Sequence, residues 1–471
     1  MVAPLALSEL EKLTFFIALR TGAGLTFWHA TRISSGWQKL FFMRADQVFG
    51  ISPELRENSY VDRGNLDVSI STYLARTTHV AIRGPSKCGK SWLRQKALSN
   101  AITVQCRLQK PFTDIYVDAL SQLNINVHVK ESRQGVFKAS LGAKGEAGAS
   151  LLAKAGINAS IGNERGTNSE HKVIGHDIDD LRFIAEIIKK SERRLVIEDF
   201  HYMSTDDRRN FAFDLKALWD YGVFVIIIGV WSETNLLLHL NTDLSGRVQE
   251  ISIDWSQDDL RKILTKGGDA LKVHFSEELQ TRLAGLAYSN AGILQQLALL
   301  TLDEAKFTSK GLFRHEVSDV SFVENASMLY ADQLNPLYQQ FAKNVSKGIR
   351  SRPNSTGIYA HAMAVIMTAT DEELIRGLPA RKIFERAVKR QERIQYSNLK
   401  AILEKMEDLQ IDSEGRGLVI GYSPESEEVV VVDRQLLLYR RFATVKWPWE
   451  ELIREAEKNG NECLDLPNLG A

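Results

Sequence analysis

Cysteine is scarce in this sequence, and the few cysteines are scattered. The three cysteines among 471 residues, Cys88, Cys106 and Cys463, include no C-x-x-C pair. This spacing argues against a disulfide framework or a zinc site and favours a reducing, cytoplasmic compartment. An excess of charge is also lacking, because 59 lysines and arginines balance 59 aspartates and glutamates. No overall field therefore draws the chain toward nucleic acid or an anionic membrane.

The N-terminal segment lacks the features of a signal peptide and of a membrane span. Residues 1–46 are rich in apolar and aromatic side chains, but Glu9 and Glu11 precede the first apolar run, which is the wrong charge order for a signal peptide. Charged residues such as Arg20 and Lys39 interrupt the segment, so no run of about 20 apolar residues exists. We expect a helical appendage that packs on the body or on a partner, with no membrane contact.

One glycine-rich run carries most of the information in the chain. Residues 84–91 fit the P-loop pattern G-x-x-x-x-G-K-[ST], with a short apolar strand expected before them (79–83) and a helix after them (92–98). Backbone N–H groups of such a loop and the helix N-terminus bind phosphate oxygens. Lys90 is expected to reach the β- and γ-phosphates, and Ser91 to bind Mg²⁺. The residues expected at the nucleotide are Gly84, Pro85, Ser86, Lys87, Cys88, Gly89, Lys90, Ser91 and Trp92.

A second motif is an apolar strand that ends in two carboxylates. Residues 195–199 read Leu-Val-Ile-Glu-Asp, which places Glu198 and Asp199 at the carboxyl edge of a parallel sheet, where the P-loop also opens. One acid would hold Mg²⁺ and the other would polarise the attacking water. We favour Glu198 for the metal and Asp199 for the water. In the alternative, Asp199 serves the metal and a separate catalytic acid is missing.

Two further candidates follow the apolar run at residues 223–230, which reads as a central parallel strand. Ser232, just beyond its end, could contact the γ-phosphate or could simply cap a helix. Arg247 stands directly before another expected strand. It could stabilise charge on a transferred phosphoryl group from a neighbouring subunit, or it could be a surface arginine paired with a carboxylate.

The order of these motifs resembles the AAA+ and STAND classes of P-loop ATPases, especially the initiator and transposition-ATPase branch and related prokaryotic STAND regulators. The resemblance covers about residues 47–306 and includes Tyr-Val-Asp-Arg at 60–63, the P-loop, the acidic strand end and Gly-Arg at 246–247. It implies that Arg247 is the arginine finger. Family members often carry an arginine or a Gly-x-Pro motif in the lid, and residues 290–295 contain neither.

The C-terminal third has a different pattern. Helices are expected at 358–375, 380–390 and 398–409, followed by two strands that form a hairpin at 415–432. Three helices and a hairpin look like a winged-helix domain. The segment before the last helix is basic and suits phosphate contacts, whereas acidic residues at the hairpin tip disfavour DNA. The basic residues are Arg381, Lys382, Arg386, Lys389, Arg390 and Arg393.

The expected fold is therefore an α/β parallel-sheet P-loop NTPase domain with a helical lid, followed by an α+β winged-helix-like domain. The Ala-, Gly- and Ser-rich segment 138–170 buries little apolar area and is expected to be a flexible insertion. The expected divisions are an appendage (1–46), the ATPase core with that insertion (47–254), the lid and linker (255–345), and the winged-helix-like domain with a C-terminal helix (346–471).

The function predicted from these features is that of a Mg²⁺-dependent ATPase acting as a switch on a protein partner. The resemblance extends this to prokaryotic defence or stress signalling and to homo-oligomers completed by Arg247. One alternative is a DNA-acting ATPase of the initiator or transposition-loader type. Another is a nucleotide-binding scaffold that does not hydrolyse, since Glu198 and Asp199 stand in the reverse of the common order. ATP is preferred to GTP because no Asn-Lys-x-Asp motif is present.

Overall fold

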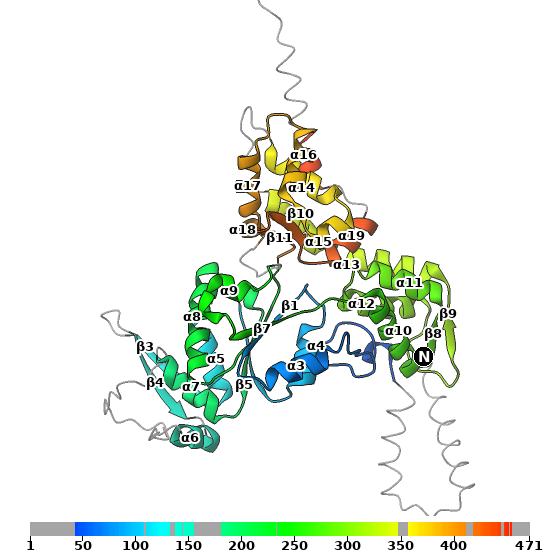
Figure 1. Cartoon of the computed structure of the whole chain (residues 1–471). Coiled ribbons are helices and arrows are strands. Elements are labelled where there is room, and N and C mark those ends of the chain that lie inside the picture. Colours follow the sequence, from blue (N-terminus) through cyan, green and yellow to red (C-terminus); the bar gives the residue numbers. More distant parts are fainter. Residues whose placement is uncertain are drawn as a thin grey trace, which may run out of the picture.

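The computed structural model describes residues 43–107, 110–131, 137–143, 145–154, 180–231, 233–346, 357–410, 418–443, 447–451 and 453–454. An α/β core, a helical region and a C-terminal domain are joined within these ranges (Figure 1). The predicted appendage at 1–46 lies outside the described residues, apart from its last four positions. No helix in the described ranges is long and apolar enough to cross a membrane.

The centre of the core is a parallel sheet, as the sequence predicts, and its five strands lie in the order β2-β5-β6-β1-β7. Strand β1, which leads into the P-loop, is separated from the acidic strand β5 by β6 alone. Because all neighbouring strands of this sheet are parallel, the carboxyl ends of β1 and β5 lie at the same edge of the sheet. The strands are β1 (His79–Arg83), β2 (Ala101–Gln105), β5 (Arg194–Glu198), β6 (Ile226–Gly229) and β7 (Val248–Ser252).

Side chains along the strands alternate between two apolar cores, one on each face of the sheet. In β1, Val80 and Ile82 enter one core with helices α3 and α4, while Ala81 enters the other with α5, α7 and α8. Burial on both faces explains why these strands read as nearly continuous apolar runs. The helices are α3 (Leu66–Leu74), α4 (Lys90–Ala97), α5 (Asp114–Gln122), α7 (Leu181–Lys190), α8 (Thr205–Asp220) and the short α9 (Leu236–Leu240).

The segment predicted as a flexible insertion at 138–170 contains regular structure in its described part. Strand β3 (Ile125–Glu131) pairs antiparallel with β4 (Phe137–Ala143), and α6 (Gly145–Lys154) follows. Cross-strand pairing satisfies backbone groups that a loop would leave to water, and Leu152 of α6 is buried in the core beside α7. The composition therefore did not predict this hairpin and helix. Residues 155–179 lie outside the described ranges.

A helical region, the lid, follows β7 and has its own apolar centre. Residues 43–50 pack on this region rather than ending an appendage at 46: the Ala45 amide donates to the Thr308 carbonyl at 2.9 Å, and the Phe49 ring meets Phe275 edge-on. The lid elements are α10 (Gln257–Leu271), β8 (Val273–Phe275), α11 (Glu277–Leu286), α12 (Ala291–Glu304), β9 (His315–Val317) and the long α13 (Val320–Ser346).

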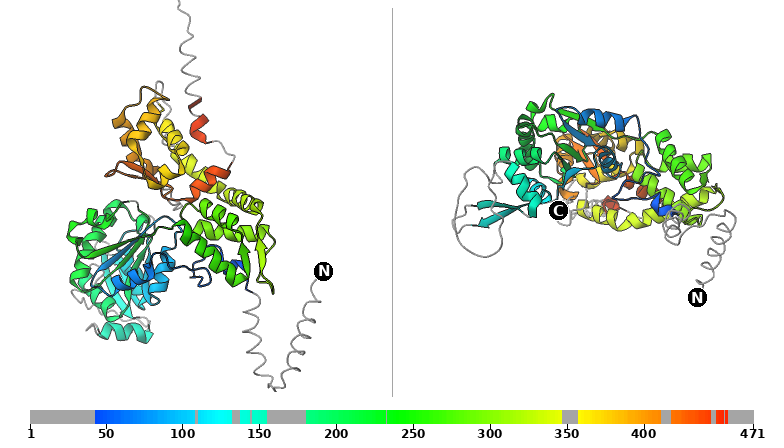
Figure 2. Two further views of the ribbon diagram at one scale, coloured as in Figure 1. Left: turned by 45° about the vertical axis from the view of Figure 1, so that its right-hand side comes forward. Right: turned by 90° about the horizontal axis from the view of Figure 1, so that it is seen from below.

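The C-terminal domain packs on the lid through α13 and α19 (Figure 2). One cluster of buried apolar side chains includes residues of both parts. The predicted hairpin is present as β11 and β12. The helix expected at 358–375 is instead two helices, because Thr370 and Glu373 form a capping box that starts the second. The elements are α14 (Ile358–Thr368), α15 (Asp371–Arg376), β10 (Leu378–Pro379), α16 (Ala380–Val388), α17 (Tyr396–Glu404), α18 (Met406–Gln410), β11 (Ile420–Ser423), β12 (Glu428–Val431) and α19 (Gln435–Phe442).

Candidate nucleotide site

The P-loop follows β1 and ends where α4 begins, in the geometry that the sequence predicts. Gly89 has φ +91°, a backbone conformation that glycine adopts without strain, and it directly precedes Lys90 at the start of α4. Most of the loop lines one hollow together with residues 50–52 and the start of α12. We call this hollow the P-loop pocket. The predicted residues that line it are Ser86, Lys87, Cys88, Gly89, Lys90, Ser91 and Trp92.

Lys90 lies inside the loop and points back along it. Its Nζ donates hydrogen bonds to the carbonyl oxygens of Gly84, at 2.9 Å, and Pro85, at 2.6 Å. These bonds hold the ammonium group over the concave side of the loop without neutralising its charge. The Cys88 side chain is buried and acts as a small filler. The loop therefore presents a positive charge beside the amides of a helix N-terminus, an arrangement that binds anions.

Asp199 is the acid that the structure brings to the P-loop pocket. It follows β5 with φ +58°, a left-handed conformation that turns the chain sharply at the strand end. Burial raises the pKa of its carboxyl group, the nearby Glu198 charge raises it further, and Lys90 opposes both. The Lys90 interaction links the second predicted motif to the first, so the two motifs form one site.

Glu198 faces a different hollow, on the other side of Ser91. Its carboxylate is nearly buried and accepts hydrogen bonds from Arg94 of α4, at 2.9 Å from Nη2 and 3.3 Å from Nε. Ser91 lines both this hollow and the P-loop pocket. Glu198 and Ser91 can therefore approach one cation together, with Arg94 competing for the same carboxylate.

His201 is a pocket residue that the sequence analysis missed, although it stands only two positions after Asp199. Its Nδ1 accepts the Val230 amide hydrogen at 3.3 Å, so the ring hydrogen is on Nε2. Burial first, and then Lys90 and Arg208, lower the pKa of this imidazole to about 3, which keeps it neutral. It therefore offers a neutral hydrogen-bond donor at the pocket wall.

The two remaining sequence candidates are Ser232 and Arg247. Ser232 lies outside the described residues. Arg247 directly precedes β7, whose first residue is in register with His79 at the start of β1. The P-loop follows the other end of β1, so Arg247 is on the order of 20 Å from its own P-loop. Its guanidinium stacks on the Trp219 ring at 4.7 Å and donates to the Asp243 carbonyl oxygen.

The lid contacts the P-loop through the N-terminus of α12. Asn290 caps this helix with its side-chain oxygen and donates from Nδ2 to the Ser86 carbonyl at 2.7 Å. The Gly292 amide donates to the Lys87 carbonyl oxygen at 3.0 Å. A Cβ atom on Gly292 would lie 2.5 Å from that oxygen, so only glycine permits this approach. Asn290 and Gly292 belong to the segment 290–295, which contains neither an arginine nor a Gly-x-Pro motif. This segment thus joins the lid directly to the P-loop.

Replacing Gly292 with alanine is expected to lower nucleotide affinity by about tenfold, because the added methyl group forces α12 away from the P-loop. Titration with a fluorescent nucleotide measures this change. Gly285→Ala in α11 is a matched control, since a Cβ there meets no atom within 4 Å. The control should keep its affinity and gain about 0.5–1 kcal/mol of stability. Equal affinities for the two variants would contradict a tight contact between lid and loop.

The C-terminal domain also reaches the P-loop, through residues 433–435 at the start of α19. Lys87 Nζ donates to Gln435 Oε1 at 2.9 Å. Arg434 donates to the carbonyl oxygens of Tyr288, at 3.1 Å, and Ser289, at 2.8 Å. These contacts were not predicted, but the sequence holds a signal for them: three consecutive polar residues between an apolar strand and an apolar helix. All three side chains are buried or nearly so.

The residues present fit a Mg²⁺–nucleotide complex. Gly89, Lys90 and the α4 N-terminus form an anion cradle, and Ser91 with the two acids supplies oxygen ligands. No group of three or more His, Cys, Asp or Glu side chains in the described ranges could hold a metal alone. Mg²⁺ is usually bound by one or two carboxylates together with phosphates and water.

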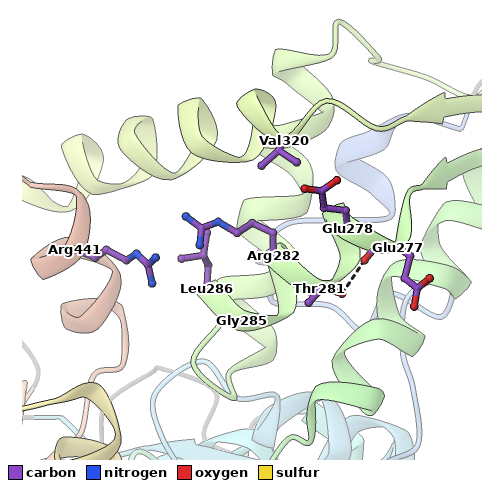
Figure 3. Close-up of a pocket in the computed structure, with 8 residues that line it drawn as sticks. All are labelled: Glu277, Glu278, Thr281, Arg282, Gly285, Leu286, Val320 and Arg441. Carbon is purple, nitrogen blue, oxygen red and sulfur yellow. Dashed lines mark hydrogen bonds between the residues drawn. The ribbon is translucent and has the colours of Figure 1, made fainter.

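A larger hollow lies away from this site, between α11, α13 and α19 (Figure 3). Its volume is about 770 Å³, against about 220 Å³ for the P-loop pocket, but it contains none of the predicted site residues. Arg282 lies at its wall and is paired with Glu324 of α13. Lys90, Ser91 and the two acids predicted from the sequence therefore lie at the smaller pocket and at the adjoining hollow that Glu198 lines.

No protein-family model and no curated protein matches this sequence. Among solved structures, the chain is similar to the Aeropyrum pernix Orc1 protein in complex with DNA, at 11% identity over 90% of this chain and 99% of that one, with a TM-score of 0.36. It is also similar to a STAND protein with a tetratricopeptide repeat sensor from Pyrococcus horikoshii, at 15% identity over 89% and 47% of the two chains, with a TM-score of 0.34.

A third similar structure is the Thermotoga maritima RuvB Holliday junction branch migration motor, at 12% identity over 79% and 92% of the chains, with a TM-score of 0.33. The chain spans less than half of the STAND protein. The assignment of the fold rests on the chain itself, on its parallel sheet, its P-loop and its lid. With these elements the chain has the α/β fold of a P-loop NTPase domain followed by a helical lid.

Proposed function

We propose that the chain is an ATP-dependent switch whose P-loop domain controls the position of its C-terminal domain, and through it a protein partner. The observation that carries this proposal is the hydrogen bond from Lys87, in the P-loop, to Gln435, at the start of α19. Nucleotide phosphates compete for the same ammonium group. Nucleotide binding and the attachment of α19 are therefore coupled.

Arg434 gives this attachment its strength. It contacts two lid carbonyls and lies 3.9 Å from the Asp254 carboxylate of the core, while only 7% of it is exposed. Burial lowers the pKa of its guanidinium, and the Asp254 charge opposes that effect. A buried arginine between three parts of the molecule loses its partners when any one part moves, which makes its contacts cooperative.

In the proposed hydrolysis, Mg²⁺–ATP supplies the reacting phosphate and a cation that neutralises its charge. Lys90 and the amides of the loop orient the phosphates. Ser91 and Glu198 would hold the Mg²⁺ ion, and Asp199 would accept a hydrogen bond from the attacking water. The raised pKa of Asp199 makes this carboxylate a stronger base than an exposed one. Arg94 restrains Glu198 until the cation competes for it.

Arg247 fits this proposal only between subunits. It cannot reach the P-loop of its own chain, and it stands at the opposite end of the sheet. We propose that it completes the site of a neighbouring subunit in an assembly. Its present partners are the Trp219 ring and a backbone carbonyl oxygen, and neither is a carboxylate that would neutralise its charge.

A DNA-acting ATPase is the second candidate, and one observation favours it. The acids expected to repel DNA at the hairpin tip face the chain's own side chains: Glu427 is bonded to Lys400 at 2.6 Å, and Glu425 lies 3.2 Å from His239. Another contact disfavours a DNA-acting role. Arg386 of the basic segment donates to Glu373 at 2.6 Å, so its charge is already paired within the chain. The other basic residues of the segment are exposed. Arg381 and Lys382 are paired with Glu385 and Glu373, which leaves Lys389, Arg390 and Arg393 to face phosphates.

ATP hydrolysis by the purified chain, with and without duplex DNA at two salt concentrations, separates the candidates. The switch predicts turnover that DNA does not change. Stimulation by DNA that fades as salt rises would instead favour the DNA-acting enzyme. Nucleotide binding without any turnover would favour a scaffold.

A further inference from the structure

The larger hollow beside α19 is formed by two parts of the chain and carries opposite charges at its two ends. One wall is α11, and the facing wall is Arg441 of α19. Figure 3 shows Glu277 and Glu278 at one end and Arg441 at the other, with Arg282 between them. The helix α11 is about 15 Å long, so this wall has room for about four residues of an extended chain. We call this site the α11 hollow.

The two arginines of the α11 hollow point toward one another across it (Figure 3). Arg282 donates from Nε to Glu324 at 2.7 Å, so one side of its guanidinium is already bound. Arg441 is exposed and forms no ion pair with a carboxylate in the described ranges, whereas the adjacent Arg440 is paired with Asp371. Like charges that face one another repel. A carboxylate between them would remove this repulsion and accept hydrogen bonds from both.

The acids around the α11 hollow decide which anion fits. Glu277 and Glu278 are exposed at the end away from Arg441, and Glu324 lies behind Arg282. A polyanion such as duplex DNA is repelled by these three carboxylates. A short protein segment with one acidic side chain, and a basic side chain about three residues away, complements both ends. Val320 also lines the hollow and suits apolar side chains between the two charges.

We propose that the α11 hollow binds an extended segment of the protein partner through one acidic side chain, which Arg282 and Arg441 hold between them. Arg441 is on the same short helix as Gln435, whose side chain accepts the hydrogen bond from Lys87. The complete hollow therefore exists only while α19 is attached, and ATP weakens binding of the segment. The site follows from the hollow itself, whereas this coupling to ATP rests on the proposed function.

Two short peptides test the site on the full chain without nucleotide. Fluorescently labelled Glu-Leu-Leu-Lys and Gln-Leu-Leu-Lys, both with uncharged ends, differ only in the carboxylate. We expect the Glu peptide to bind about tenfold more tightly, as hydrogen bonds from a guanidinium to a carboxylate would give. Equal affinities of the two peptides, or no change in fluorescence anisotropy with either, would overturn the inference. Displacement of the Glu peptide by duplex DNA would assign the hollow to nucleic acid and would also overturn it.

Two exposed arginines of the chain provide a variant and its control. Arg441→Gln should reduce the tenfold difference between the peptides to about twofold, because one of the two donors to the carboxylate is lost. Arg314→Gln makes the same chemical change in the lid but outside the hollow lining, and it should preserve the difference. Thermal unfolding shows whether each variant is folded. An unchanged preference for the Glu peptide in folded Arg441→Gln would contradict the proposed contact.

Mg²⁺–ATP added to the peptide assay tests the coupling separately from the site. We expect ATP to weaken binding of the Glu peptide at least about threefold, and the peptide to weaken ATP binding by the same factor, because coupling between two sites is reciprocal. Peptide binding that ATP leaves unchanged would overturn the coupling and count against the proposed switch, but not against the site. ATP-sensitive binding that does not depend on the peptide carboxylate would overturn the site and leave the switch intact.

Discussion

Replacing Lys90 with alanine is expected to reduce ATP hydrolysis by at least about 100-fold. The ammonium group is held over the P-loop by two backbone carbonyls and interacts with Asp199. Its charge is available to stabilise phosphate oxygens before and during transfer. Steady-state release of phosphate measures the loss, and nucleotide titration shows how much of it comes from weaker binding.

The control for this variant lies on the same helix. Lys96 of α4 is exposed and bonded to Glu57 at 2.8 Å, outside the P-loop pocket. Lys96→Ala removes the same charge and the same number of atoms but should leave hydrolysis within about twofold of the original, since surface ion pairs contribute little. Equal effects of the two substitutions would mean that Lys90 acts only through the overall charge of the helix.

Replacing Asp199 with asparagine should lower turnover by about 10²- to 10⁴-fold and leave nucleotide affinity unchanged or higher. The amide keeps the shape of the side chain but cannot accept a proton from water. It also removes a negative charge from a pocket that binds phosphates. Single-turnover hydrolysis and nucleotide titration on the same sample separate the two effects.

Glu198→Gln is the matched comparison, because it makes the same chemical change at the neighbouring position. Glu198 shares a hollow with Ser91, so this variant should raise the Mg²⁺ concentration needed for half-maximal turnover. Asp199→Asn should leave that concentration unchanged. The opposite pattern, with the Mg²⁺ requirement altered only by Asp199→Asn, would support the alternative assignment in which Asp199 serves the metal.

Much of the catalytic core could be predicted from the sequence because its signals are local. The glycines, Lys90 and Ser91 of the P-loop stand in consecutive positions, and the apolar strand before Glu198 and Asp199 indicates a parallel sheet. Parallel pairing of β5, β6 and β1 then brings the two motifs to the same edge. The roles of the two acids stay predictions, as do those of Ser232 and Arg247.

Contacts between distant segments were the part that the sequence did not reveal. Lys87 and Gln435 are 348 residues apart, and Gly292 meets the same loop from a third region. No periodicity connects such positions, since side-chain pairing over these separations depends on how α12 and α19 pack. The hairpin of β3 and β4 and the helix α6 were missed for a different reason: small residues from 138 onward were taken as flexible, although strand pairing and the burial of Leu152 stabilise them.

In the proposed switch, nucleotide at the P-loop controls the attachment of α19. Hydrogen exchange at residues 435–442, with and without Mg²⁺–ATP, measures that attachment. We predict faster exchange at the start of α19 when ATP is bound, and the same faster exchange in Lys87→Ala without ATP, because that variant has already lost the bond to Gln435. Exchange that neither ATP nor Lys87→Ala changes would contradict the coupling.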